Sequence, residues 1–155
     1  MITFREPEPP LTEERVANFE KELGTSLPDQ YRRFLLRTNG GLVSSDTNVV
    51  DLDGAPWSST DVHVFFGIGG SVESSELSWN RSTFSERIPD ELLPIADDSG
   101  GCVFCLSLKG PDRGAVLFCD LQSVAFDYEA TPKFYPVAPD FEAFLTKIRP
   151  LSEED

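Results

Sequence analysis

The sequence predicts an α+β fold: a single domain with a mainly antiparallel, twisted sheet, on which two N-terminal helices and one C-terminal helix pack. Apolar residues recur at helical spacing in two segments before position 41 and again after position 138. Between these segments, short apolar runs are separated by glycine-rich turns, which is typical of antiparallel strands. The 155 residues, 39% of them apolar, suffice for one sizeable core, and no internal repeat or low-complexity linker divides them.

The N-terminal segment is predicted to be an extended lead-in over residues 1–10. Its stretch "REPEPP" is rich in proline, and each proline fixes its own φ and restricts the residue before it. We therefore expect the ordered domain to begin at Leu11 and to span residues 11–150, followed by a frayed acidic tail over residues 151–155.

The segment after this lead-in predicts a first helix that ends at Leu23. Thr12 can accept a backbone N–H as the N-cap, and Gly24 can supply the left-handed C-terminal stop. One stripe of this helix is apolar and would face the core. It comprises Val16, Phe19 and Leu23.

A second helix is predicted in "LPDQYRRFLLRTNGG". Pro28 suits the first helical position, where its missing N–H costs nothing, and Asn39-Gly40-Gly41 ends the helix. The arginines of this segment lie off the apolar stripe, and in so acidic a chain we expect them to pair with carboxylates rather than to bind nucleic acid. The stripe comprises Tyr31, Phe34 and Leu35.

The hydrophobic period changes after the second helix. "NVVDL" and "DVHVFF" predict short strands, the second with Phe65 and Phe66 on opposite faces, and "SVESSELSWNRSTF" predicts a helix. From Glu91 to Ala130, four apolar runs separated by "DDSGG", "KGPDRG" and "DLQ" predict an antiparallel meander. "APDFEAFLTKIRP" predicts the C-terminal helix, with Pro150 as its stop. The apolar face of that helix comprises Phe141, Phe144, Leu145 and Ile148.

Four blocks occur in a fixed order along the chain: "LTEERVANFEKELGTSLPDQYRRFLLRTNGG", then Gly67, then "LPIADDSGGCVFCLSL", then "GAVLFCD". Together they resemble the SUKH superfamily, which is named for the yeast cell-wall synthesis regulator and its bacterial relatives. The resemblance spans nearly the whole chain and implies a single α+β domain, commonly a bacterial immunity protein that neutralises a cognate polymorphic toxin, often a nuclease. The family offers no catalytic motif to transfer. Its recurrent residues, expected to be scaffold, are matched here by Leu27, Pro28, Tyr31, Phe34 and Gly40.

The chain carries 13 basic and 27 acidic residues, for a formal net charge of -14. This charge disfavours direct contact with nucleic acid or an anionic membrane and favours a basic partner. The N-terminus has no apolar stretch after a basic start, and no segment is long enough to cross a bilayer, so we expect a cytoplasmic protein. An odd cysteine count without a secretory signal predicts reduced thiols with packing roles, at Cys102, Cys105 and Cys119.

For each candidate chemical motif, a structural interpretation fits the sequence better than a chemical one. "GCVFC" has C-x-x-C spacing, but strand residues three apart point to opposite faces and no second pair follows. "FGIGG" has Val72 where a dinucleotide fingerprint needs its third glycine, and the glycine of "DLDG" comes two places early for a calcium loop. Asp97-Asp98 before "SGG" predicts a turn, and His63, the single histidine, a structural role. We therefore predict a protein without catalytic activity, cofactor or metal.

The predicted working surface is a set of acidic positions in central loops, where a rigid sheet can present them to a partner. Carboxylates would steer the chain toward the basic cleft of a nuclease, so we predict an immunity protein that docks on a basic toxin. Three alternatives stay open: an acidity that serves only solubility, a regulatory protein-interaction module of the yeast cell-wall type, and an enzyme using Asp97, Asp98 or a cysteine. The predicted contact residues are Asp46, Asp51, Asp53, Asp61, Glu73, Glu76, Asp97 and Asp98.

Overall fold

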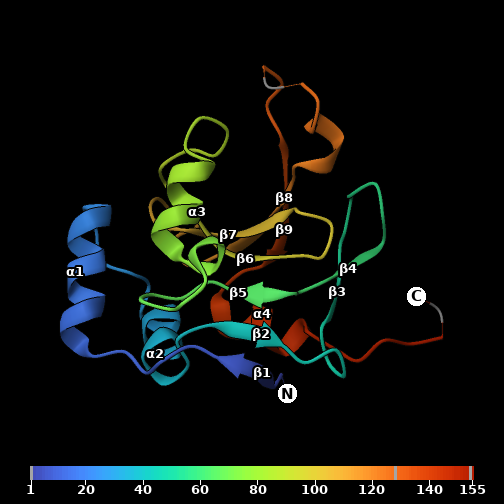
Figure 1. Cartoon of the computed structure of the whole chain (residues 1–155). Helices are drawn as coiled ribbons and strands as arrows, with labels where there is room; N and C mark the ends of the chain where they lie inside the picture. Colours follow the sequence, from blue (N-terminus) through green and yellow to red (C-terminus); the bar gives the residue numbers. More distant parts are fainter. Residues whose placement is uncertain (1, 128, 154) are drawn as a thin grey trace.

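The computed structural model describes residues 2–127, 129–153 and 155. In this part of the chain, seven strands form an antiparallel sheet in the order β1-β2-β5-β6-β7-β8-β9, and β3 and β4 pair as a separate ribbon (Figure 1). The sheet strands are β1 (Phe4–Pro7), β2 (Gly41–Val43), β5 (Val64–Phe65), β6 (Leu92–Asp97), β7 (Val103–Ser107), β8 (Val116–Asp120) and β9 (Lys133–Ala138), and the ribbon is β3 (Val49–Asp51) with β4 (Ser59–Asp61). Every residue of β7 is buried, so both faces of the sheet are covered at its centre. The predicted α+β fold is confirmed.

Residues at the ends of the helices determine where the helices begin and end. Thr12 Oγ1 accepts a hydrogen bond from the Arg15 N–H at 3.2 Å, and Gly24 ends the first helix with a φ of 76°. The second helix begins at Asp29, one residue later than predicted, with Pro28 as its N-cap. The helices are α1 (Glu13–Leu23), α2 (Asp29–Arg37), α3 (Leu77–Thr83) and α4 (Phe141–Lys147), with 3-10 turns η1 (Glu73–Ser75) and η2 (Gln122–Val124). None of the described helices is both long and apolar enough to cross a bilayer.

Aromatic rings fill the space between the sheet and the pair α2 and α4. The ring centroid of Phe34 in α2 lies 5.3 Å from that of Phe65 in β5 and 4.9 Å from that of Phe141 in α4. Phe144 reaches the central strands, with its ring centroid 5.2 Å from that of Phe104. These tilted contacts fix α2 and α4 on the sheet face that carries Phe65 and Phe104.

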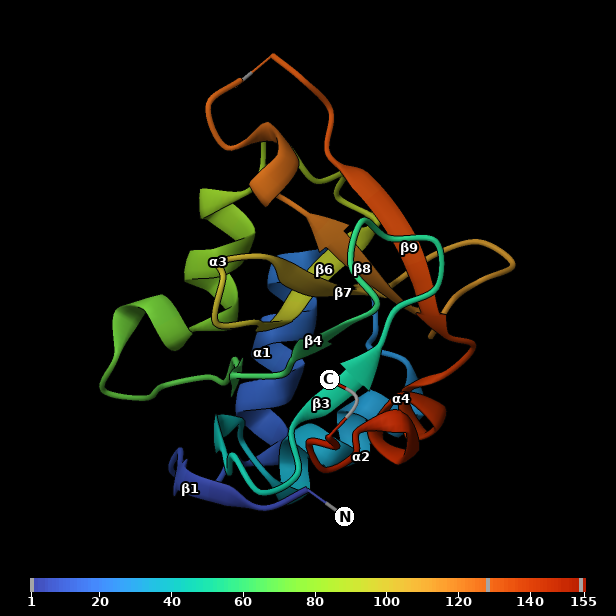
Figure 2. The same ribbon diagram turned by 90° about the vertical axis from the view of Figure 1, so that its right-hand side faces the viewer.

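The ribbon β3–β4 packs on the sheet beside this aromatic layer. The ring of Trp57, in the loop between its strands, stands edge-on to Phe118 of β8 at 5.9 Å. In Figure 2 the ribbon faces the viewer, above α2 and α4. The backbone of Val49 also exchanges two hydrogen bonds with that of Arg149, so the ribbon joins the C-terminal segment to the sheet.

Asn39 and Gly40, predicted to end the second helix, form a close backbone crossing. The Asn39 side chain is buried; its amide donates to the carbonyls of Pro9 at 2.6 Å and Ile68 at 2.7 Å, and its carbonyl accepts from the Ile68 N–H at 2.8 Å. Gly40 has a φ of 69°, and a Cβ there would lie 2.4 Å from the Phe65 carbonyl oxygen. A side chain is therefore excluded at Gly40, and Asn39 fastens two distant segments together.

The structure places a strand within the lead-in, before Leu11. Residues Phe4–Pro7 form β1, which pairs with β2 at the edge of the sheet. Phe4 anchors this strand, with its ring centroid 5.9 Å from that of Phe65. Pro7 is compatible with a strand at the sheet edge, where its missing N–H breaks no ladder.

Two predicted strands differ in position. "DVHVFF" is divided, because β4 ends at Asp61 in the ribbon while β5 covers only Val64–Phe65 in the sheet, and Phe65 and Phe66 are both buried. In the fourth run of the meander, Ser123 and Val124 belong to η2 and the other described residues form no strand, while Tyr128 lies outside the described residues. The next strand is β9. Asp120 causes this turn, since its carboxylate accepts from the Ser123 N–H at 3.1 Å and the Ser123 hydroxyl at 2.5 Å.

The chain end also differs from the predicted frayed tail. Asp155 lies back against Arg149, at 2.7 Å between Oδ1 and Nη2, and accepts from the Ser152 N–H at 2.7 Å. The boundaries 11–150 of the domain remain a prediction.

Candidate functional site

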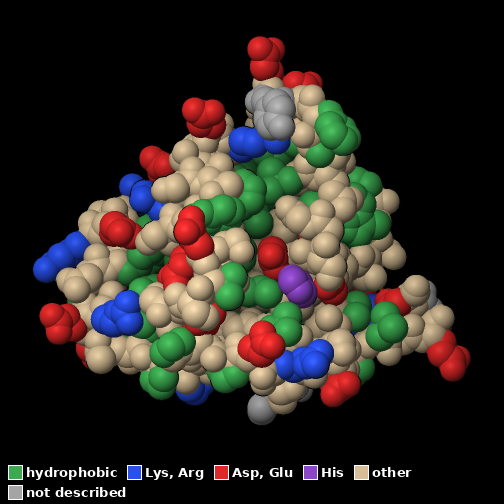
Figure 3. Space-filling view, in the orientation of Figure 1, with side chains coloured by type: hydrophobic (Ala, Val, Ile, Leu, Met, Phe, Trp, Pro, Cys, Tyr) green, Lys and Arg blue, Asp and Glu red, His purple; other side chains and the backbone are tan. Residues whose placement is uncertain are grey.

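The predicted contact residues fall into two places. Six of them lie on the ribbon or beside it, and we call these the ribbon carboxylates: Asp46, Asp51, Asp53, Asp61, Asp97 and Asp98. Glu73 and Glu76 lie apart from them, at η1 and the start of α3. In Figure 3 the single histidine (purple) lies near the middle of the visible face, with carboxylates (red) beside it. It shows where β5 lies next to the ribbon.

Asp61 and Asp98 fasten the ribbon to the turn between β6 and β7. Asp98 is 4% exposed; its carboxylate accepts from the Thr60 hydroxyl at 2.8 Å, the Gly100 N–H at 3.0 Å and the Cys102 N–H at 2.8 Å. The Asp61 carboxylate accepts from the Ser99 N–H at 2.9 Å and from the Ser99 hydroxyl. Burial raises the pKa of Asp98, and its hydrogen bonds from Thr60 and the turn oppose that rise. Asp98 therefore belongs to the interior of the turn and not to the exposed acidic surface.

Asp97 lies beside the single histidine. Its Oδ1 is 3.2 Å from His63 Nδ1 and accepts from the Val64 N–H at 3.0 Å. Burial raises the pKa of Asp97, while the neighbouring His63 acts in the opposite direction. The backbone N–H of His63 also donates to the Asp97 carbonyl at 2.8 Å, so the pair aligns β5 with β6.

The remaining ribbon carboxylates differ in whether a cation neutralises them. Asp51 Oδ1 is 2.7 Å from Nη2 of Arg149, and this hydrogen-bonded guanidinium lowers the pKa of Asp51. Asp46 and Asp53 are exposed, and within the described residues neither forms an ion pair. Asp46 and Asp53 are therefore the ribbon carboxylates that carry unpaired charge into solvent.

Glu76 organises the loop before α3. Its carboxylate accepts from the Gly69 N–H at 2.9 Å and the Gly70 N–H at 2.5 Å. The pKa of the nearby Glu8 is raised, first by burial and second by the charge of Glu76. Glu73 is exposed in η1. The structure thus does not bring Glu73 and Glu76 onto the ribbon with the other predicted residues.

The chain is similar in sequence to known proteins. The sequence model of the SMI1 / KNR4 family (SUKH-1) matches residues 10–147. The chain belongs to this family. It is also similar to the SPbeta prophage-derived uncharacterized protein YokK of Bacillus subtilis (strain 168), with 27% identity over 149 residues that cover 88% of this chain and 74% of that protein.

The residues that carry the SUKH-1 resemblance lie inside the fold. Leu27 and Tyr31 are each 1% exposed and Phe34 is 4% exposed. The Tyr31 ring stands edge-on to that of Phe141 at 5.1 Å, and Gly40 sits at the backbone crossing described above. These positions build the α2–α4 layer, as expected for scaffold.

The cysteines of this SUKH-1 chain are free and buried. Burial raises the pKa of Cys105 well above its ordinary value and that of Cys119 to about 12. A thiol acts as a nucleophile or metal ligand when its pKa is lowered, so these environments favour the packing role predicted for them. Among the described residues, no group of three or more His, Cys, Asp or Glu is arranged to hold a metal ion.

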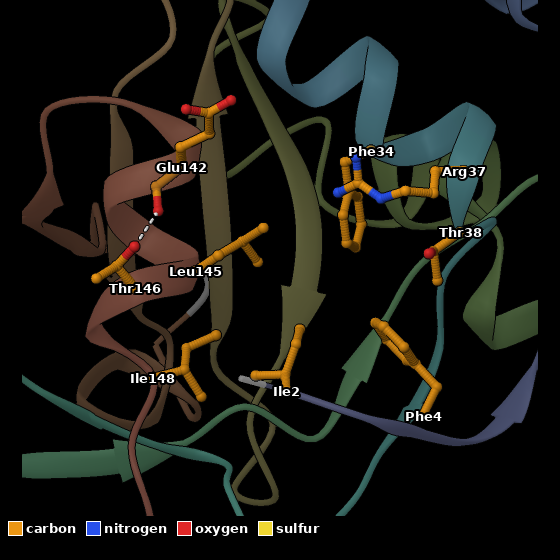
Figure 4. A pocket seen from close by; sticks show the side chains of 9 residues that line it. All are labelled: Ile2, Phe4, Phe34, Arg37, Thr38, Glu142, Leu145, Thr146 and Ile148. Carbon is orange, nitrogen blue, oxygen red and sulfur yellow. Dashed lines mark hydrogen bonds between the residues drawn. The ribbon is translucent and has the colours of Figure 1, made fainter.

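Sequence reasoning missed a groove beside β1. It has a volume of about 690 Å³ and lies between the N-terminal strand, the end of α2 and α4 (Figure 4). Ile2, Phe4 and Leu145 contribute apolar walls, while Arg37 and Glu142 supply charge. The spacing of Ile2 and Phe4, two apart before the prolines, was the available signal for a strand with one apolar face.

Proposed function

We propose that this chain is an immunity protein that binds a cognate bacterial toxin domain in the cytoplasm and neutralises it by occupying its surface. The complex is stoichiometric and involves no bond making or breaking by the immunity protein. The toxin domain is a nuclease with a basic cleft, which suits a polyanionic substrate. The contact surface is the exposed side of the ribbon, with Asp46 and Asp53 as its unpaired charges.

Membership of the SUKH-1 family carries this proposal, because that family includes immunity proteins. The negative net charge of the chain supports a partner whose contact surface is positively charged. A net charge of -14 raises the rate at which a basic protein approaches, and speed matters for a protein that must intercept a toxin.

The firm attachment of the ribbon to the sheet supports the ribbon as the place where the toxin binds. Trp57 packs on Phe118, and the carboxylates of Asp61 and Asp98 bond to the neighbouring turn or strand, so the ribbon backbone is held on the sheet. A surface that is ordered before binding loses less conformational entropy when it binds. Asp46 and Asp53 are therefore presented from a support that does not need to rearrange.

Co-expression is the direct test. The proposal expects a secreted protein with a toxin-like C-terminal domain to be encoded immediately upstream of this gene, and that domain, produced in a host that it poisons, is the probe. Expression of this chain should restore growth, and the two purified proteins should co-elute as a one-to-one complex whose affinity falls as salt rises. Growth that is not restored, together with separate elution at low salt, would show that the proposal is wrong.

A regulatory protein-interaction module is the second candidate, because the matching family is itself named SMI1 / KNR4 and the resemblance includes a yeast cell-wall synthesis regulator. It uses the same kind of surface with a different partner. The co-expression test separates the two, since a regulator does not rescue cells from the upstream toxin domain.

A further inference from the structure

The loop between η2 and β9 presents an aromatic ring to solvent. Phe126 is 100% exposed, more than any other large apolar side chain in the described residues; Leu151 follows at 69%. This loop projects beyond the sheet at the top of Figures 1 and 2. A ring with this exposure adds nothing to the packing of the folded chain, and its burial against a partner would be favourable.

The backbone on both sides of Phe126 is held from a distant segment. Arg87 Nη2 donates to the carbonyls of Val124 at 3.1 Å, Asp127 at 3.1 Å and Ala130 at 3.2 Å. These residues lie 37 to 43 positions along the chain from Arg87, so the guanidinium ties the loop to the turn that follows α3. The loop therefore holds its shape through long-range contacts, and Phe126 is presented from a fixed backbone.

Exposed carboxylates on the loop and on the turn tied to it restrict what can bind there. Asp127 and Glu129 are exposed in the loop itself, and Glu86 and Asp90 are exposed in the turn to which Arg87 belongs. Carboxylates at this density repel the phosphates of nucleic acids and of anionic bilayers. They complement a protein surface on which an apolar pocket is bordered by lysine or arginine, the arrangement in which an aromatic side chain contributes most to an interface.

We propose that Phe126 is the anchor of the toxin-binding surface: its ring enters an apolar pocket of the toxin domain, basic side chains of the toxin border that pocket, and Arg87 pre-orders the loop. This inference rests on the proposed function and adds to it a contact that is apolar and lies outside the ribbon. Steering by the ribbon carboxylates governs how fast the complex forms, and Phe126 governs how long it lasts.

The test uses a catalytically inactive form of the same toxin domain as the probe. The Kd of Phe126→Ala should be about 30-fold or more above that of the unsubstituted chain, mainly through faster dissociation. Phe126→Trp, which keeps an aromatic ring, should retain most of the affinity. Val72→Ala is the matched control, since it removes a 52% exposed apolar side chain in the loop before η1, and it should leave Kd within about twofold.

Arg87→Gln tests the clamp. It should weaken binding in the unsubstituted chain and have little further effect in the Phe126→Ala background, because the clamp acts through the ring. Equal losses in both backgrounds would show that Arg87 does not act by ordering Phe126.

Three further outcomes overturn the inference. If the Kd of Phe126→Ala lies within about twofold of that of the unsubstituted chain, the inference is wrong and the proposed immunity function is unaffected. A Tm lowered by Phe126→Ala in the free protein shows that the ring packs within the fold. Absence of binding by the unsubstituted chain removes the proposed function and this inference with it.

Discussion

The aromatic layer and the ribbon are attached to the same sheet by different physical contacts. Phe34, Phe141 and Phe144 attach α2 and α4 through ring packing that no titration or salt can weaken directly. The ribbon combines buried apolar side chains, among them Val50, and the ring of Trp57 with the hydrogen-bonded carboxylates of Asp61 and Asp98. The difference teaches that acidic residues of this chain serve two purposes: some hold the ribbon in place, and others are left exposed on it.

The largest effect is expected in the aromatic layer. Phe144→Ala should lower the free energy of unfolding by about 3–5 kcal/mol, because it empties a fully buried site between β5, β7 and α4. Urea denaturation followed by tryptophan fluorescence measures it. A loss below about 1 kcal/mol would mean that α4 does not stabilise the sheet as described.

Asp98→Ala should have the next largest effect. It leaves the buried Cys102 N–H without its acceptor and releases Thr60 on the ribbon, for a loss of about 1–3 kcal/mol. Asp98→Asn, which keeps one acceptor oxygen, should lose less, as the same denaturation experiment would record. Equal stability of Asp98→Ala and the unsubstituted chain would contradict the fastening role.

Arg149→Ala should have a smaller effect, because its ion pairs with Asp51 and Asp155 lie at the surface. We expect a Tm lowered by less than about 4 °C and faster hydrogen exchange at the Val49 amide, which bonds to the Arg149 carbonyl. A drop in Tm as large as that of Asp98→Ala would place the main attachment of the ribbon at the chain end instead.

The smallest effect is a difference in pH dependence between two ribbon carboxylates. The raised pKa of Asp98 contributes stability that is present below its ordinary value of 3.8 and is lost as pH rises through the raised value. The lowered pKa of Asp51 contributes stability that is present above 3.8 and is lost as pH falls.

Unfolding free energies measured between about pH 3 and pH 6 should therefore separate the two variants. Relative to the unsubstituted chain, Asp98→Asn should lose stability more steeply on acidification, and Asp51→Asn less steeply. Changes in slope of the same sign for both variants, each relative to the unsubstituted chain, would contradict the assignment.

Much of the fold was predictable because its signals are local. Thr12, Gly24 and the apolar stripes determine α1 and α2, and the glycine turns determine the hairpins of β6, β7 and β8. β1 was missed because it is stabilised by a distant contact, that of the Phe4 ring with Phe34, thirty positions along the chain. The prolines near Phe4 predict an extended segment that pairs with no other strand. β9 was misplaced because Arg87 and Asp120 stabilise a loop where the apolar run "SVAFDYEA" predicted a strand.

The acidic character of the candidate site could be predicted from the sequence, but the positions of its residues in the structure only in part. Asp46, Asp51 and Asp53 follow one another closely along the chain, and the structure places them on the ribbon or beside it. Burial of Asp98 could not be foreseen, since one of its donors, Thr60, comes from 38 positions away. Phe126 was missed because an apolar residue in an apolar run predicts a buried strand, and only the completed loop exposes it.

The central claim, that exposed ribbon carboxylates guide docking onto a basic toxin domain, is tested most directly by the association rate constant with the inactive toxin domain at low and high salt. Asp46→Asn combined with Asp53→Asn should lower the rate several-fold at low salt and flatten its salt dependence. The control, Glu14→Gln combined with Glu91→Gln, removes the same charge from exposed positions outside the ribbon and should change the rate less. Equal rates for the two double variants would contradict the claim.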